Sequence, residues 1–169
     1  MKRFTAASTL VLTLTLTTSG CATTGGPEVN DNLTVQEAKA RAQAMEIELA
    51  GQIPAEEVAS VDQDPAGVLF PCMGEREYQW TGQTKVVLAP GAEYDGAAVT
   101  SSIESNYRGR DGWSASTDQT SDGEPRVQVV GRDDEGYLVA LSVDKTFVQI
   151  LSFSPCFILP EGMSPSVDY

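Results

Sequence analysis

The chain has 169 residues and contains no histidine. Ser-His-Asp and Cys-His catalysis require an imidazole as the base, and many metal sites require it as a ligand. Those classes are therefore excluded, and only chemistry based on carboxylates, tyrosine or lysine is left. No carboxylate pair, phosphate-binding glycine loop or nucleophile motif stands out either. We expect a protein that is not an enzyme and that uses no cofactor or metal.

The sequence also lacks an apolar run long enough to cross a membrane. Residues 4–18 are interrupted by several threonines, whereas a membrane-spanning helix needs about 20 mostly apolar residues. This stretch follows a basic start at residues 1–3, and no acidic residue occurs before Glu28. A basic start, a short apolar core and small residues at a cleavage site define a secretory signal. We therefore expect residues 1–20 to be an export signal.

The signal ends in Thr18-Ser19-Gly20-Cys21. This resembles the lipobox of bacterial lipoproteins, in which small residues lead directly into an invariant cysteine, although Thr18 stands where leucine is usual. The resemblance covers residues 1 to 26 and implies cleavage before Cys21, a diacylglyceryl group on its sulfur, and a place on the extracytoplasmic side of the cell membrane. Two acyl chains anchor a protein stably, whereas one holds it only marginally. The alternative is an ordinary secretory signal in which the cysteine has no such role.

The rest of the chain divides into a tether, one domain and a tail. Residues 21–33 are small and polar without apolar periodicity, so we expect a flexible tether from the lipidated cysteine. The threonine-rich composition of signal and tether is similar to that of small lipoproteins of high-GC Gram-positive bacteria. Residues 34–158 have the length of one domain. Residues 159–169 contain two prolines and are expected to fray.

Basic residues are scarce, with 11 Lys and Arg against 24 Asp and Glu, a formal net charge of −13. Removal of the signal takes away Lys2 and Arg3, which leaves 9 basic against 24 acidic residues and a net charge of −15. We expect no nucleic-acid partner, because binding to phosphates depends on Lys and Arg. The charge would also repel an anionic membrane surface. We interpret it as a solvated surface; attraction of a cationic partner or metal ions is the alternative.

Cysteine is scarce as well, and of the three in the chain Cys21 is assigned to lipid. Cys72 and Cys156 remain, an even pair in an exported and oxidising compartment where disulfides form. They lack the CxxC spacing of a redox or metal pair. We therefore predict a disulfide between Cys72 and Cys156 that closes a loop over most of the domain.

Two segments have helical patterns. Thr34 and Glu37 form a capping-box pattern, and an apolar stripe follows at spacings of three and four: Val35, Ala38, Ala42, Met45 and Leu49. This predicts a helix over residues 34–50, ended by Gly51. A second helix is predicted over residues 95–108, where Val99, Ile103 and Tyr107 recur at spacings of four.

The remaining patterns are typical of strands. Residues 75–90 predict one long strand with a bulge at Thr81-Gly82, with a hairpin as the alternative. Residues 52–71 contain prolines that exclude a long regular element. Four alternating segments joined by short connections predict an antiparallel meander: residues 112–118, 126–132, 137–144 and 147–153. The fold class is therefore α+β, with an antiparallel sheet of about five strands and two helices packed on one face.

Two clusters of side chains are candidate sites. Tyr107, Arg110 and Trp113 bring together residue types that are favoured in interfaces, and we treat them as a candidate binding edge. The alternative is that Trp113 packs in the core while the arginines pair with nearby acids. Residues 133–136 place three acids before a glycine, which could suit calcium but is more typical of a turn between strands.

Our first hypothesis is a membrane-anchored, non-enzymatic binding or envelope-associated module. It would contact a protein partner or an envelope molecule through its sheet face or loops, which requires an exposed apolar or aromatic patch. The first alternative is a carrier that holds a lipid or small hydrophobic ligand in a pocket between helices and sheet. The second is an enzyme that uses Asp or Glu alone, which requires buried acids in a cleft.

Overall fold

A computed structural model describes residues 29–169. The predicted export signal, the segment that resembles a lipobox with Cys21, and most of the predicted tether lie outside the described residues. Neither helix within residues 29–169 has the length and apolar composition needed to cross a membrane.

Both predicted helices are confirmed. Helix α1 (Val35–Ala50) begins after Thr34, whose side chain accepts a hydrogen bond from the Glu37 N–H, while the Glu37 carboxylate accepts the Thr34 N–H at 3.0 Å. This reciprocal capping box satisfies two backbone donors that the first turn cannot use. Helix α2 (Gly96–Arg108) begins after Asp95, whose carboxylate accepts the Ala98 N–H.

The fold class is α+β as predicted, but the sheet is larger and more complex than five antiparallel strands. Within the described residues it has nine strands and one parallel pair, β1 with β9. The order of hydrogen-bonded neighbours is β1-β9-β4-β8-β7-β6-β5. Strands β8 and β9 pair with successive stretches of one edge of β4, and β2 and β3 pair with its opposite edge. The strands are β1 (Val29–Asn30), β2 (Val58–Gln63), β3 (Val68–Pro71), β4 (Glu77–Leu88), β5 (Ser114–Gln119), β6 (Pro125–Val130), β7 (Gly136–Leu141), β8 (Phe147–Phe153) and β9 (Cys156–Ile158).

The strands that the sequence did not indicate are short or lie at the edges of the sheet. Strands β2 and β3 lie in the proline-containing segment 52–71, together with the short 3-10 helix η1 (Ala55–Glu57). Most residues of β2 are exposed, so no alternation of apolar and polar residues marks it. Both strands exist because the long β4 offers them an edge to pair with.

Strand β4 is one continuous strand, as predicted, but it has no bulge at Thr81-Gly82. Its register with β8 runs unbroken from Thr81 to Val87. Gly82 is needed for another reason: a Cβ atom there would overlap the indole of Trp80. Trp80 is fully buried, so the glycine leaves room for its ring against the strand.

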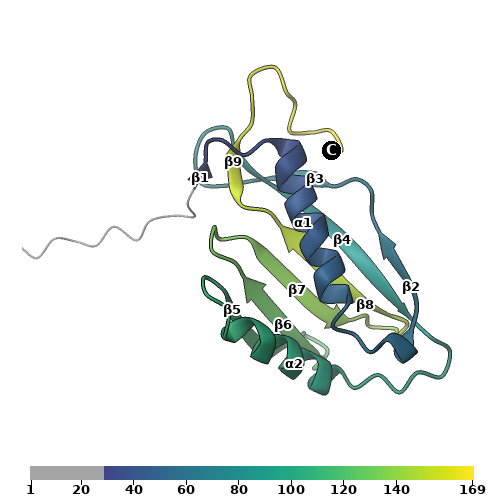
Figure 1. Ribbon diagram of the computed structural model, residues 1–169. Coiled ribbons are helices and arrows are strands. Elements are labelled where there is room, and N and C mark those ends of the chain that lie inside the picture. Colours follow the sequence, from purple (N-terminus) through teal and green to yellow (C-terminus); the bar gives the residue numbers. More distant parts are fainter. Residues whose placement is uncertain (1–28) are drawn as a thin grey trace, which may run out of the picture.

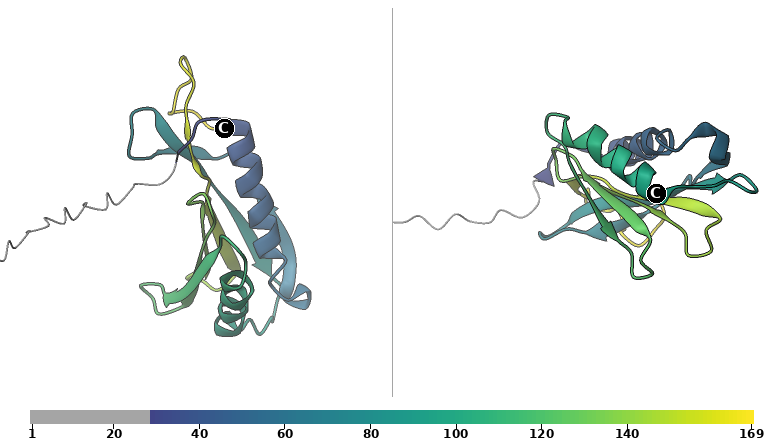
Figure 2. Two further views of the ribbon diagram at one scale, coloured as in Figure 1. Left: turned by 60° about the vertical axis from the view of Figure 1, so that its left-hand side comes forward. Right: turned by 90° about the horizontal axis from the view of Figure 1, so that it is seen from below.

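The meander β5-β6-β7-β8 is confirmed, and the whole sheet curls into a half-barrel (Figure 1). Both helices lie on the same, concave side of the sheet (Figure 2, right). The main apolar cluster contains side chains from both helices and from β4, β6, β7 and β8. A smaller cluster joins the first half of α1 to Trp80, Leu69 and Phe157. Within residues 29–169, no helix lies on the opposite, convex face.

The two ends of the described chain are more ordered than we expected. Residues 29–33, assigned to the tether, include β1, and Leu33 packs against the smaller apolar cluster. The tail does not fray, because Leu159 is buried and the backbone of Tyr169 exchanges two hydrogen bonds of 2.9 Å with Gly67. The sequence pattern missed these contacts because each joins residues that are far apart in the chain.

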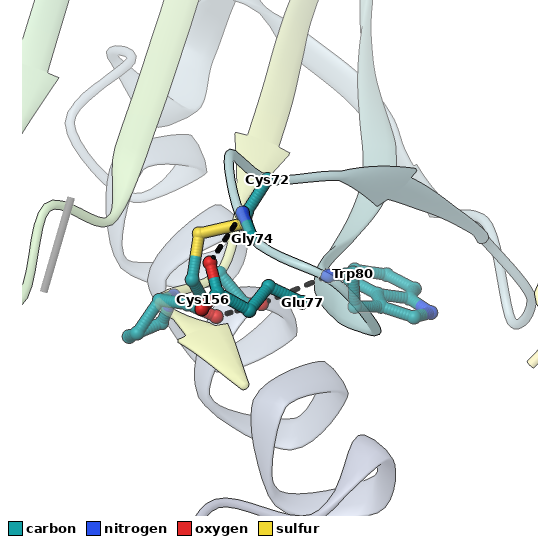
Figure 3. The surroundings of a disulfide bond; sticks show 7 residues. Cys72, Gly74, Glu77, Trp80 and Cys156 are labelled. Carbon is teal, nitrogen blue, oxygen red and sulfur yellow. Dashed lines mark hydrogen bonds between the residues drawn. A yellow bond between two sulfur atoms is a disulfide. The ribbon is translucent and has the colours of Figure 1, made fainter. Parts of the chain in front are cut away.

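The predicted disulfide between Cys72 and Cys156 is present, with Cα atoms 6.4 Å apart (Figure 3). Cys72 lies in the loop between β3 and β4, and Cys156 begins β9. The bond therefore fastens the β3–β4 loop to the strand that also holds β1.

Candidate functional site

The convex face of the sheet carries a group of incompletely buried apolar side chains, which we call the convex patch. Leu138 lies opposite Leu151, and Val68 and Phe153 both lie opposite Thr81, so all four project from the same face. Val68 is 50% exposed, and the other three are half-buried. Polar side chains border them on the same face: Gln79, Gln83, Lys85, Gln128 and Gln149. An apolar centre with a polar rim is typical of binding surfaces.

A hollow of about 270 Å³ opens in the convex patch. It lies in the gap between the stretch of β4 that pairs with β2 and the stretch that pairs with β3. Val68, Leu151 and Phe153 supply its apolar lining. Its polar groups bind one another, because Gln149 donates to Gln83 at 2.9 Å and Gln83 donates to Asp64 at 2.7 Å. The hollow therefore offers apolar surface with only a few polar contacts at its rim.

A second apolar hollow lies beside α1 rather than under it. It measures about 410 Å³ and is bounded by the end of α1, η1 and β2, with Ile47, Ile53, Val58 and Val61 in its lining. Ile47 and Val61 are 47% and 44% exposed. The apolar stripe of α1, by contrast, is packed tightly against the strands: Val35, Ala38, Ala42, Met45 and Leu49 are all buried.

A buried carboxylate separates the two apolar clusters beneath α1. Glu46 is fully buried and accepts hydrogen bonds from Gln63 at 2.8 Å, from Thr84 at 2.7 Å and from Ser152. Both of its oxygens are used, and all three donors come from strands. Because leaving these buried donors without a partner would be costly, the network fixes the position of α1 on the sheet.

A second buried carboxylate belongs to an ion pair with α1. Glu135 is 1% exposed and accepts two hydrogen bonds from the Arg41 guanidinium, at 2.8 and 2.7 Å. Arg41 also contacts Asp133 at 2.8 Å, and the Tyr137 hydroxyl donates to Glu135 at 3.0 Å. Residues 133–136 therefore form the expected turn, with two of its acids turned toward an arginine. Within the described residues no group of three or more Cys, Asp or Glu could hold a metal ion.

The electrostatics of this ion pair follow from its burial. Partial burial acts to lower the pKa of Arg41, but its hydrogen bonds to Glu135 and Asp133 outweigh this and raise the pKa. Burial, together with the charge of Glu135, raises the pKa of Tyr137 far above its ordinary value. Tyr137 therefore stays protonated and acts as a hydrogen-bond donor.

The three residues of the candidate binding edge do come together, but mostly inside the domain. Tyr107 is fully buried, and its hydroxyl donates to Glu48 at 2.8 Å. Trp113 is half-buried, and the centroid of its ring lies 5.4 Å from the centroid of the Tyr107 ring. Arg110 pairs with Glu48 at 2.6 Å and covers the Tyr107 ring at 4.4 Å. A partner could reach only Arg110 and part of Trp113.

Sequence reasoning missed Arg41, Glu46 and the convex patch. A weak signal existed for the first two, because each lies three or four positions from members of the apolar stripe of α1 and so borders its buried side. Their partners lie between 17 and 106 positions away, which no local pattern reveals. The convex patch required the register of β3, a strand that was not predicted.

The comparisons with known proteins give no family assignment. No protein-family model, no curated protein and no solved structure matches this chain.

Proposed function

We propose that this chain is an extracytoplasmic lipoprotein, anchored by lipid on Cys21, whose domain is a non-enzymatic binding module. The convex patch, which would contact a protein partner or an envelope molecule, carries the proposal. Its four apolar side chains stay partly in contact with solvent on a face that neither helix covers. A fold that needed this face only for stability would gain by covering it, since burial of apolar surface stabilises by about 25 cal/mol per Å².

The arrangement of the buried acids supports a non-enzymatic role. Each oxygen of Glu46 and of Glu135 accepts at least one hydrogen bond from a side chain of the protein itself. Both carboxylates are also buried, whereas a general base must lie within hydrogen-bond reach of its substrate.

Replacement of the proposed lipidation site tests the anchor. We expect Cys21→Ser to move the protein out of the membrane fraction and to remove the lipid mass from the mature chain, because serine offers no thiol for the diacylglyceryl group. Fractionation of producing cells and intact-mass spectrometry measure both effects. Retention of the Cys21→Ser protein on the membrane would show that another feature holds it there.

Site-specific photo-crosslinking in the producing cell tests the convex patch. A photoreactive amino acid at Leu151 lies in the patch, whereas one at the exposed Ser102 lies on α2, on the other side of the sheet. We expect discrete crosslinked products from position 151 and none from position 102. Equal products from both positions, or from neither, would contradict a binding role for the patch.

A carrier is the second candidate, and the apolar hollow beside α1 favours it. At about 410 Å³ this hollow has the size of a small-ligand site and is lined mainly by apolar side chains. Native mass spectrometry of the protein extracted in mild detergent distinguishes the two functions. A non-covalent mass that is lost on activation, and that is absent from a Val58→Asp variant, would favour the carrier. A clean mass would favour the binding module.

A further inference from the structure

Three exposed apolar side chains lie at the end of the domain where the described chain begins, and we call them the exit-end patch. Phe70 is 56% exposed, Met73 82% and Ile158 38%. Phe70 lies opposite Gln79 and Ile158 opposite Glu77, on the two sides of β4, so both project from the convex face. Met73 lies in the loop that joins β3 to β4.

The chain leaves the domain beside this patch. Val29 of β1 pairs with Cys156, which is bonded to Cys72, the neighbour of Met73. Val29 lies eight residues after Cys21 in the sequence. A segment of eight residues spans at most about 28 Å when it is fully extended. Lipid on Cys21 would therefore keep the exit end within that distance of the bilayer.

The opposite end of the domain has no such constraint. Strand β4 has 12 residues and is therefore about 40 Å long. The turn between β7 and β8 lies beside its far end, because Phe147 pairs with Val87 there. This turn carries Val143, an apolar residue that is 78% exposed and therefore about as exposed as Met73.

A disulfide and hydrogen bonds tie the loop between β3 and β4, which carries Met73, to the rest of the domain (Figure 3). The disulfide fixes its first residue, and the Gly74 N–H donates to the Glu77 carboxylate at 2.7 Å. The Arg76 guanidinium donates to the Leu159 carbonyl, with its Nε 3.1 Å from that oxygen. Contact with another surface would therefore cost little ordering of the loop.

We propose that the exit-end patch inserts into the interface of the bilayer that holds Cys21. The inference rests on the proposed lipid anchor and adds the orientation of the domain. Strand β4 points away from the membrane, so the bilayer does not cover the convex patch. Attachment through Cys21 raises the effective concentration of the patch at the bilayer, so weak insertion suffices. The loop carries Glu75, Arg76 and Glu77, so the contact depends on apolar burial rather than on attraction to anionic lipid.

Tryptophan quenching by brominated lipid tests this contact. The mature lipidated protein is placed in phosphatidylcholine vesicles with brominated acyl chains, as the variants Met73→Trp and Val143→Trp. Trp80 and Trp113 supply the same background in both proteins. We expect the brominated lipid to quench the fluorescence of the tryptophan added at position 73 and to leave that of the tryptophan at position 143 unchanged. Phe70→Trp, at a second position of the patch, should behave like Met73→Trp, and circular dichroism checks that each variant is folded.

Flotation of the same vesicles separates this inference from the anchor. Protein that does not float with the vesicles would overturn the anchor and with it the contact. Protein that floats but shows no quenching at positions 70 and 73 would overturn the contact alone and leave the patch to a protein partner. Equal quenching at positions 73 and 143 would also overturn it, because the domain would then lie flat on the bilayer.

Discussion

Arg41 is the residue whose side chain ties α1 to the turn before β7. Its guanidinium is the cationic partner of Glu135, which is 1% exposed. We expect Arg41→Met to lower the free energy of unfolding by about 3 kcal/mol, because a buried carboxylate is left without its partner. Urea unfolding followed by circular dichroism measures the loss.

A second arginine provides the control for Arg41. Arg108 pairs with Glu104 on the surface of α2 and is 68% exposed. We expect Arg108→Met to change stability by less than about 0.5 kcal/mol. The double variant Arg41→Met/Glu135→Gln should recover part of the loss, because the uncompensated charge is gone. Equal losses from the two arginine variants would contradict this account.

Glu48 links the stability of the domain to pH. Partial burial acts to raise its pKa, but the hydrogen bonds from Arg110 and Tyr107 outweigh this, and the pKa lies below its ordinary value near 4.5. The unfolded chain therefore binds the proton more tightly than the folded one. The stabilisation is complete above about pH 5 and is lost as the pH falls through the folded-state pKa.

We expect Glu48→Gln to reduce the fall in unfolding free energy between about pH 5 and pH 3. Because Glu48 is 40% exposed, solvent screening keeps its contribution below about 1 kcal/mol. Urea unfolding at a series of pH values measures the slope. The same slope in the variant and the wild type would show that Glu48 does not contribute to it.

Among the elements, β4 organises the sheet, because β2, β3, β8 and β9 all pair with it. Its middle depends on Gly82, which leaves room for the indole of Trp80. We expect Gly82→Ala to lower the free energy of unfolding by about 1–3 kcal/mol, because the added methyl group overlaps a buried ring.

Gly109 is the matched control for Gly82. It ends α2 with an ordinary negative φ of −89°, and a Cβ atom there would meet nothing within 4 Å. Gly109→Ala should be neutral or slightly stabilising, because alanine restricts the unfolded chain more than glycine does. Thermal and urea unfolding of both variants make the comparison. If Gly82→Ala were as stable as the wild type, the strand would have to shift away from Trp80 without cost.

At the scale of the whole molecule, the disulfide closes a loop with a sequence separation of 84 residues. Linking such distant residues restricts the unfolded chain, which stabilises the fold by up to about 4–5 kcal/mol in the chain-entropy estimate. We expect the variant Cys72→Ala/Cys156→Ala to lose several kcal/mol. Urea unfolding of the wild type with its disulfide intact, compared with that of the variant, gives the difference.

Thiol labelling of the protein isolated from its producing cells provides the direct check on the disulfide. Cys72 and Cys156 should stay unlabelled when the protein is denatured without reductant, and both should react after reduction. Labelling of both before reduction would show that the bond does not form in the cell.

Local patterns in the sequence were sufficient for the elements whose signals lie within a few residues. The capping box and stripe placed α1, and alternation with short connections placed β6, β7 and β8, because each pattern repeats inside one element. The pairing of Cys72 with Cys156 followed from counting cysteines in a chain that we expected to be exported. The cluster at Tyr107 was found, and the alternative to a binding edge, a packed Trp113 with a paired arginine, was stated with it; the structure packs Trp113 against the core and pairs Arg110 with Glu48.

Only the tertiary structure determined the features that depend on distant partners. Strands β2 and β3 form because β4 offers them an edge, and β1 forms because β9, which pairs with β4 and carries Cys156, offers it an edge. Glu46 and Glu135 can be buried because Ser152 and Arg41, 106 and 94 positions away, supply the hydrogen bonds. A charged side chain is normally a surface residue in a sequence pattern, and only a partner brought to it by the fold makes its burial stable.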